Sequence, residues 1–285
     1  MDAKKVLGTV IATLSLVALP PAATGTAAGE RSARWAPAAT ASITPGVQMF
    51  TRGAQCTGNF VFRDAAGRTY VGYAAHCAGR GAATDTDGCS TRSHPLGTRV
   101  RFARGATVAG GGTTVGRGTL AYSSWRTMRA LGESRAEVCA ANDFALVRVG
   151  RRHVRKVNPS VPFWGGPTGL SAAAPTGSQV HSYGSSSLRP TGVLSPKVGA
   201  SLGRTHGGWG VEVYTATPGI PGDSGSGFLD DRGRALGTLS TVAVAPLPGS
   251  NGLGTLAREL AYAQRHAGIR GLRLVEGTVD FRPLP

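Results

Sequence analysis

The sequence has 285 residues, 41% of them hydrophobic, and a formal net charge of +16. This length suits one large domain or two small ones, and the apolar share excludes a disordered chain. Glycine contributes 43 residues and proline 17. Because these turn formers recur at short intervals between apolar runs, the composition favours an all-β protein.

The positive charge is spread along the chain. Its densest basic run comprises Arg151, Arg152, Arg155 and Lys156. A basic surface attracts anionic polymers, but no aromatic stacking pattern and no groove-reading motif accompanies this run. We therefore expect at most weak polyanion or cell-wall adhesion and no specific nucleic-acid partner.

The N-terminus has the parts of an export signal. Lys4 and Lys5 precede an apolar run of 14 residues, Val6 to Leu19, and small residues then offer a cleavage site near Ala28. The run is shorter than the ~20 residues that span a bilayer, which disfavours an uncleaved anchor. We expect residues 1–28 to be a signal peptide, and the mature protein to be secreted, extracellular and free of the membrane.

Beyond the signal, residues 29–42 are polar and rich in Ala and Pro, as in a linker or short pro-segment. Short apolar runs cut by turn formers then predict strands. These strands are expected at 59–63, 69–74, 98–102, 144–149, 179–183, 210–215, 226–229 and 235–244. A basic, Pro-rich stretch, 150–167, is interpreted as the crossing between two halves.

A helix is predicted near the end of the chain. Thr255 can cap it, it runs to about Ala267, and Gly268 stops it. Its apolar face is expected to pack onto the second half and consists of Leu253, Leu256, Leu260 and Ala263. A tail, 269–285, follows without an assigned role.

The sequence contains four cysteines: Cys56, Cys77, Cys89 and Cys139. An oxidising compartment allows disulfides, and four cysteines permit three pairings. None forms a C-x-x-C pair, which argues against a zinc site. We expect no metal and no cofactor.

One serine lies in a setting that suits nucleophilic catalysis. A serine hydroxyl needs a base, a group that orients the base, and donors for the oxyanion. Ser224 lies in Gly222-Asp223-Ser224-Gly225, where glycines allow a tight turn that can aim the amides of Gly222 and Ser224 at one oxygen. Taken alone, the same residues also describe an ordinary polar turn.

Candidates for the base and the orienting acid occur upstream. His76 ends an apolar strand and adjoins Cys77, so a disulfide can lock its loop; a buried, backbone-satisfied histidine is the alternative. Asp143 precedes an apolar run, where a carboxylate is costly unless it is hydrogen-bonded. A histidine N–H would satisfy it and fix the tautomer, although a strand-end turn also accommodates an aspartate.

The three motifs AAHC, DFALV and PGDSG, in this order, resemble the chymotrypsin-like serine proteases, and more narrowly their secreted actinobacterial branch. The resemblance covers about Ile43 to Ala267. It implies an all-β fold of two six-stranded antiparallel β-barrels with a C-terminal α-helix. The first barrel would span 43–155 and the second, with its terminal helix, 156–268.

The resemblance also implies roles for individual residues. His76 and Asp143 would come from the first barrel and Ser224 from the second, as a catalytic triad. Cys56 would pair with Cys77, which leaves Cys89 with Cys139. Ser240 would support Asp143 and begin the substrate-binding strand.

Departures from the family pattern bear on specificity and activation. Pro218 stands where trypsin-like members carry a basic-residue-binding aspartate, and Thr241 and Val242 should narrow the pocket, so we expect a small or apolar P1 residue. Ser226 replaces a usual glycine. Activation could use a new N-terminus at Ile43, paired with Asp223, or an internal basic residue that the sequence does not reveal.

The sequence thus predicts a monomeric, secreted serine endopeptidase that cleaves proteins or peptides through an acyl-enzyme. The alternative is a catalytically silent homologue that binds protein or anionic cell-wall polymer. An intact triad favours the enzyme, whereas the unexplained activation and the narrowed pocket favour the binding protein.

Overall fold

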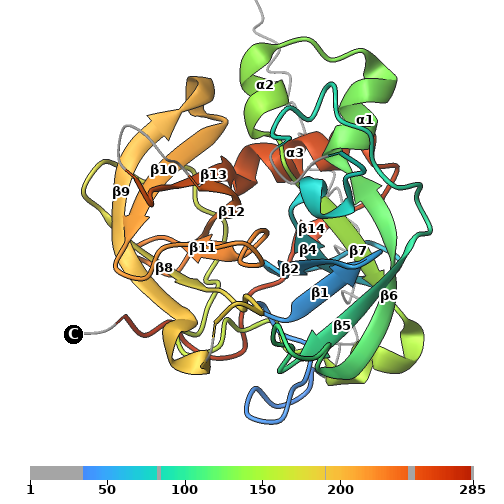
Figure 1. The fold of residues 1–285 in the computed structure, drawn as a ribbon, viewed down its shortest axis with the longest axis vertical. Helices are drawn as coiled ribbons and strands as arrows, with labels where there is room; N and C mark the ends of the chain where they lie inside the picture. Colours follow the sequence, from blue (N-terminus) through green and yellow to red (C-terminus); the bar gives the residue numbers. More distant parts are fainter. Residues whose placement is uncertain (1–34, 82–84, 190, 243–247, 284–285) are drawn as a thin grey trace, which may run out of the picture. The chain divides into compact units, whose positions relative to one another are not determined.

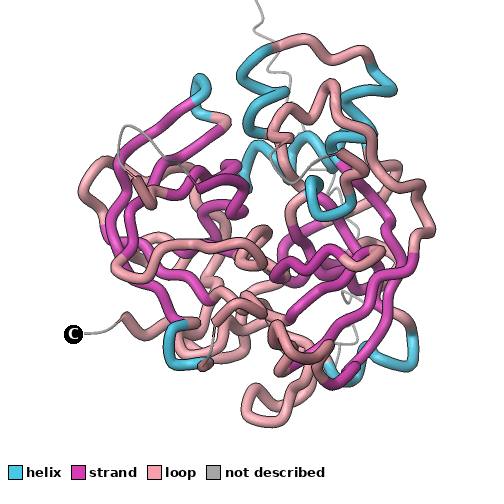
Figure 2. Tube along the Cα trace, viewed as in Figure 1, coloured by secondary structure: helices cyan, strands magenta, loops and turns pink. Residues whose placement is uncertain are grey.

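The computed structural model describes residues 35–81, 85–189, 191–242 and 248–283. The predicted signal peptide lies outside these residues. Within them, the strands form one eight-stranded antiparallel sheet and one closed six-stranded barrel (Figure 1). Strands and loops make up most of the trace, and the helical segments are short (Figure 2). No helix in the described part of the chain is long and apolar enough to cross a membrane.

The eight-stranded sheet contains the first half of the chain and one strand of the tail. Its order is β14-β3-β4-β7-β6-β5-β1-β2. Cross-strand aliphatic pairs such as Val71 with Val147, and Leu120 with Val147, form its core. The strands are β1 (Gln48–Thr51), β2 (Ala54–Thr57), β3 (Val61–Arg63), β4 (Thr69–Tyr73), β5 (Arg99–Arg104), β6 (Thr113–Ser123), β7 (Ala145–Val149) and β14 (Arg273–Leu274).

The closed barrel contains the second half, in the order β10-β13-β12-β11-β8-β9. Its interior is a separate apolar cluster that includes Val180, Val213, Phe228 and Leu236. The strands are β8 (Gln179–Tyr183), β9 (Pro196–Thr205), β10 (Gly210–Thr215), β11 (Gly227–Leu229), β12 (Ala235–Val242) and β13 (Asn251–Thr255). The predicted all-β architecture of two halves with a C-terminal helix is confirmed.

Each strand expected from the sequence is present, with ends shifted by a few residues at most, and the last two residues of the expected strand 235–244 lie outside the described residues. The described residues also contain strands that were not predicted, among them β6, β9 and β13, whose glycines and polar residues obscure the alternation. The sheet of the first half has eight strands instead of the expected six. One extra strand arises because β1 and β2 form a hairpin of two short strands, and the other is β14 from the tail.

Three α-helices occur in the described residues: α1 (Ser124–Leu131), α2 (Ala136–Ala141) and α3 (Leu256–His266). The first begins at Ser123, whose hydroxyl accepts from the Arg126 N–H, and ends at Gly132 in the left-handed region. The second carries Cys139, which is bonded to Cys89. Both lie between β6 and β7, in a stretch for which the sequence predicted no helix.

Helix α3 matches the predicted span, but Leu253, expected on its apolar face, lies in β13 and packs inside the barrel. The packing of the helix also differs from the prediction. Leu256, Leu260 and Ala263 belong to a cluster that contains Phe62 of β3 and Trp164, which follows β7 along the chain. The helix therefore packs against both halves, not against the second alone. Thr255 stands at the N-cap, yet its hydroxyl makes no hydrogen bond among the described residues.

The tail connects the two halves. Leu272 is buried in the same cluster as α3, and the next residues form β14, which pairs with β3 of the sheet. Farther on, the Phe281 ring lies 5.1 Å from the His181 ring of β8 in the barrel. The tail thus runs from the sheet to the barrel and is part of the core.

Candidate active site

His76 lies in a short 3-10 helix, η1 (Ala75–Ala78), directly after β4. Its neighbour Cys77 is bonded to Cys56 of β2, which confirms the pairing that the family resemblance implied and anchors the turn. His76 is the one residue of η1 that is not buried. Its imidazole Nδ1 lies 2.6 Å from Asp143 Oδ2, and its backbone N–H donates to Asp143 Oδ1 over 2.8 Å.

Asp143 lies between α2 and β7 and is 2% exposed. Besides the two contacts with His76, its Oδ2 accepts a hydrogen bond of 2.6 Å from the Ser240 hydroxyl of β12. A carboxylate that accepts from Nδ1 requires the proton on Nδ1, which leaves Nε2 of His76 as the free base. The support of Asp143 by Ser240, expected from the resemblance, is present in the geometry.

The electrostatics of the pair follow from its burial. Burial raises the pKa of Asp143, but the charge of His76 and the hydrogen bonds from His76 and Ser240 outweigh it, so the pKa is lowered overall. Burial lowers the pKa of His76, but the charge and hydrogen bond of Asp143 outweigh that effect, and the pKa is raised. The pair therefore favours an ionised carboxylate beside an imidazole that readily accepts a proton.

Ser224 lies in a turn that contacts the histidine segment. Within 222–226 it is the residue that is not buried. Its carbonyl accepts from the Thr57 N–H at 2.8 Å. The next residue, Gly225, has a φ of +88°, and a Cβ there would lie 2.9 Å from the backbone N of Ala74, two residues before His76. No hydrogen bond of the Ser224 hydroxyl occurs among the described residues.

The backbone around Ser224 offers two free donors. Neither the Gly222 N–H nor the Ser224 N–H donates a hydrogen bond to any residue that the structure describes. Gly222 has a φ of +94°, and its carbonyl accepts from Thr57 Oγ1 at 2.8 Å and from Gln55 Nε2 at 3.1 Å. With its carbonyl held in this way, the turn leaves both amides available to an oxyanion.

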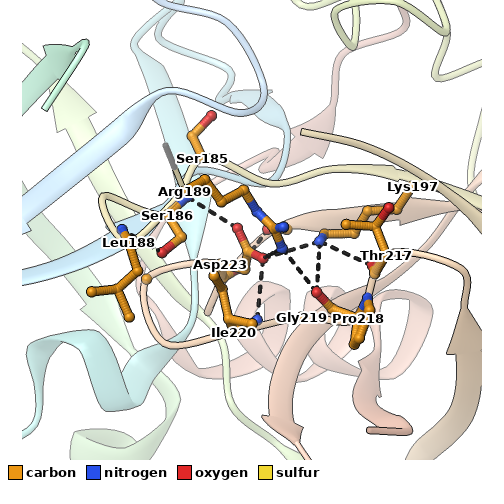
Figure 3. A network of polar contacts seen from close by, with 12 residues as sticks. Ser185, Ser186, Leu188, Arg189, Lys197, Thr217, Pro218, Gly219, Ile220 and Asp223 are labelled. Atoms are coloured by element: carbon orange, nitrogen blue, oxygen red, sulfur yellow. Dashed lines mark hydrogen bonds and ion pairs between the residues drawn. The ribbon is translucent and has the colours of Figure 1, made fainter. Parts of the chain in front are cut away.

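Asp223, between these two residues, is fully buried and is held by two internal cations (Figure 3). Its Oδ2 lies 2.5 Å from Arg189 Nη2 and 3.0 Å from Lys197 Nζ. Both cations also donate to the Pro218 carbonyl, and the Ser186 N–H donates to Asp223 Oδ1 at 3.0 Å. Burial lowers the pKa of Lys197, and Asp223 partly offsets that effect.

Arg189 and Lys197 are thus the cationic partners of Asp223 in this structure. In this uncut chain the Ile43 N–H donates to the Lys156 carbonyl over 3.0 Å and Ile43 is fully buried, and a new N-terminus at Ile43 stays a prediction. Sequence reasoning missed Arg189 and Lys197. The one signal available was a lysine inside β9, because a fully buried lysine requires an anionic partner.

A second carboxyl lies behind Asp143. Glu259 of α3 is fully buried; its Oε1 accepts from the Asp143 N–H at 3.1 Å and its Oε2 from the Thr238 hydroxyl at 2.8 Å. Burial is the main cause that raises the pKa of Glu259 to about 8, with a further contribution from the charge of Asp143. The sequence analysis did not single out Glu259, although a glutamate on the apolar side of α3 was a visible anomaly.

Of the residues expected to contact substrate, Ser240 contacts Asp143, whereas Pro218 contacts the cations that pair with Asp223. Ser240 contacts Asp143, and Thr241 and Val242 follow it at the end of β12. Val242 is 46% exposed. Pro218 is exposed, and its carbonyl accepts hydrogen bonds from Arg189 and Lys197, the cations that pair with Asp223. The narrowing of the pocket by Val242 stays a prediction.

Two clusters in the described residues have the spacing of metal ligands. One consists of Cys56, His76 and Cys77, and the other of Asp87, Cys89 and Cys139. In both clusters the cysteines are joined in disulfides, so their sulfurs are not thiolate ligands.

We predict that Glu259 makes the stability of the protein depend on pH. The folded chain keeps the Glu259 proton up to about pH 8, whereas the unfolded chain releases it near 4.5. The folded state then binds more protons in this window, so the free energy of unfolding should fall as pH rises, by at most about 1.4 kcal/mol per pH unit.

Urea unfolding at several pH values, followed by circular dichroism, measures this slope. Glu259→Gln should remove the component, while Glu276→Gln, at an exposed position, should leave it unchanged. A Glu259→Gln protein with the full parental slope would contradict the assignment.

No protein-family model and no curated protein sequence matches the chain. Among solved structures, Thermobifida fusca Protease A is 19% identical, with 82% of this chain and 99% of that chain covered and a TM-score of 0.49. Nocardiopsis protease is 21% identical (81% and 98% covered, TM-score 0.49). Cellulomonas bogoriensis chymotrypsin is 20% identical (82% and 98%, TM-score 0.46). Each of these likenesses extends over most of both chains, at low sequence identity.

Proposed function

We propose that the protein is a secreted serine endopeptidase that hydrolyses peptide bonds through an acyl-enzyme, with Ser224, His76 and Asp143 as its triad. The observation that carries the proposal is the 2.6 Å contact between His76 Nδ1 and Asp143 Oδ2. It leaves Nε2 as a base on the same segment that the Ser224 turn contacts through Gly225. The two unpaired amides of that turn supply the oxyanion site.

In the first half of the reaction, the Ser224 hydroxyl attacks the carbonyl carbon of the substrate while its proton passes to His76 Nε2. The carbonyl oxygen becomes an oxyanion, which accepts from the Gly222 and Ser224 amides. Asp143 stabilises the imidazolium, which then donates its proton to the leaving amine. The C–N bond breaks and the acyl group remains on Ser224.

In the second half, water attacks the ester as His76 takes one of its protons. The second tetrahedral intermediate uses the same two amides. When it collapses, the proton on His76 returns to the Ser224 oxygen and the carboxylic acid product leaves. The raised pKa of His76 suits both its roles, because the residue must hold a proton in the intermediate and release it afterwards.

The Asp223 network supports a site that forms without a new N-terminus. Its two cations and two backbone amides hold the carboxylate between the oxyanion donors Gly222 and Ser224. A buried carboxylate with such partners has one favoured position, so the turn is preorganised before substrate binds.

A catalytically silent binding protein is the second candidate. The Ser224 hydroxyl has no hydrogen bond to His76 in the described residues, which would suit a homologue that has lost activity. Catalytic hydrogen bonds are often long in free enzymes and tighten only with substrate, so we favour the peptidase.

We predict that Ser224→Ala lowers kcat/KM for an unblocked protein substrate by at least ~10³-fold, because no other hydroxyl replaces the nucleophile. Release of soluble peptides from casein measures it, with circular dichroism to verify folding. Ser187→Ala, in the neighbouring 185–188 segment, serves as the matched control and should keep parental turnover. A Ser224→Ala protein with near-normal turnover would refute the triad.

We predict a small or apolar residue at P1. Pro218 carries no negative charge at the position where an aspartate would bind Lys or Arg. Thr241 and Val242 are the last two residues of β12, the strand proposed to bind the substrate. Cleavage-site sequencing of a peptide library by mass spectrometry should show Ala, Val or Leu as the main P1 residues. Dominant Arg or Lys would overturn this expectation.

We predict that Arg189→Met lowers kcat/KM by at least ~10-fold, because loss of one partner leaves the buried Asp223 charge less compensated and loosens the oxyanion turn. Arg189→Lys should restore part of the activity. Arg204→Met, at an exposed position of β9, is the control and should not change kcat/KM. Unchanged kinetics in Arg189→Met would show that Lys197 alone suffices.

A further inference from the structure

Arginines that are far apart in the sequence meet on the outward face of the first sheet. Arg99 of β5 pairs with Thr119 of β6, and Thr119 pairs with Arg148 of β7. Residues paired across antiparallel strands point to the same face of a sheet. Arg117 lies two residues before Thr119 and so shares that face. Arg99, Arg117 and Arg148 are all exposed.

Two flanking segments complete a groove around these side chains. Arg68 contributes from the turn between β3 and β4, and Arg151 and Arg152 contribute from a 3-10 helix, η2 (Arg151–Lys156). The groove has a volume of about 1100 Å³. We call it the arginine groove and define it by Arg68, Arg99, Arg117, Arg148, Arg151 and Arg152.

Most of the charge of the arginine groove has no acidic partner among the described residues. No Asp or Glu lines it. Arg68 is paired with Asp64 at 2.5 Å, but the other five arginines form no ion pair with any residue that the structure describes. Five guanidinium groups on one concave surface repel one another, and an anion would relieve that repulsion.

A histidine, His153, lies among these arginines, and their charges contribute to lowering its pKa. His153 lines the groove; its Nδ1 is buried without a hydrogen-bond partner in the described residues, and its Nε2 accepts from Arg152 Nε at 3.2 Å. Burial, followed by the charges of Arg152, Lys156 and Arg117, lowers the pKa of His153. A bound anion would oppose that effect.

The chemistry of the lining narrows the class of anion. Guanidinium groups bind phosphate through paired hydrogen bonds. Apart from arginines and His153, the lining residues are Ala, Gly, Thr and Val, so there is no Phe, Tyr or Trp ring on which a nucleobase could stack. A phosphate polymer without bases fits this surface better than a nucleic acid.

The groove is well separated from the catalytic residues. Arg68 precedes the start of β4 and His76 follows its end; Asp143 precedes the start of β7 and Arg151 follows its end. Five residues of strand extend about 16 Å. A polymer in the groove would therefore leave the Ser224 site open to substrate.

We propose that the arginine groove binds a linear polyol-phosphate polymer and holds the protein on it while the catalytic site stays accessible. The sequence run that includes Arg151 and Arg152 is then one edge of a site whose centre is formed by β5, β6 and β7. The proposal does not depend on peptidase activity, because the groove and the triad occupy opposite ends of the same strands.

The test is a titration of the full secreted protein with fluorescently labelled poly(glycerol phosphate), followed by anisotropy between 20 and 200 mM NaCl. If about five phosphates are neutralised, the plot of log K against log salt should have a slope near −3.5. The triple variant Arg99→Gln/Arg117→Gln/Arg148→Gln should bind at least ~10-fold more weakly, with a shallower slope.

The matched control removes the same charge from exposed positions elsewhere, as Arg232→Gln/Arg265→Gln/Arg282→Gln. It should change the affinity by less than about threefold. Both triple variants should unfold at the parental temperature, which keeps loss of binding distinct from loss of folding.

Three outcomes would overturn the proposal. Equal weakening in the two triple variants would mean attraction to net charge alone. Absence of binding at 20 mM salt would mean that the groove has no such ligand. Tighter binding of a single-stranded oligonucleotide of equal phosphate number would point to nucleic acid instead.

Discussion

The buried carboxylate of Asp143 is the constraint on which the site depends. A carboxylate that is 2% exposed is stable only if hydrogen bonds replace its lost hydration. Three donors do so: the His76 N–H, the His76 imidazole and the Ser240 hydroxyl. Because they come from η1 and β12, the charge of Asp143 holds the sheet and the barrel in one arrangement and sets the tautomer of His76.

Asp223, which directly precedes Ser224, is a second buried carboxylate that is stabilised by its partners. Arg189 and Lys197 pair with its carboxylate, and these contacts hold the turn that carries Ser224 and the Gly222 and Ser224 amides. Glu259 differs from these two carboxylates, because burial beside Asp143 raises its pKa and favours the neutral acid. Asp223 is thus paired with two cations, whereas Asp143 is held by hydrogen bonds from His76 and Ser240.

Local pattern was enough to predict much of this molecule. The strands that carry the motifs, the helix α3 and the order of His76, Asp143 and Ser224 are visible in short windows, and the family resemblance supplied the two disulfide pairings. What the sequence could not provide depends on distant partners. Asp223 meets Arg189 across 34 residues, and Asp143 meets Glu259 across 116. Strand β13 was missed because its glycines hide the alternation.

The arginines illustrate the same limit. In the sequence they are scattered, whereas the pairing of β5, β6 and β7 places Arg99, Arg117 and Arg148 on one surface. Only the register reveals this. The tail, to which the sequence assigned no role, is likewise understood only once Leu274 is seen to pair with Phe62 of the sheet and Phe281 to contact His181 of the barrel.

The most direct test of the proposed triad is covalent labelling of the folded protein with a fluorophosphonate, followed by mass spectrometry of the modified peptide. We expect one adduct, on Ser224, in wild type and none in Ser224→Ala, because only a serine with a working base and oxyanion donors reacts rapidly. A folded wild-type protein that stays unlabelled, or an adduct on another serine, would contradict it.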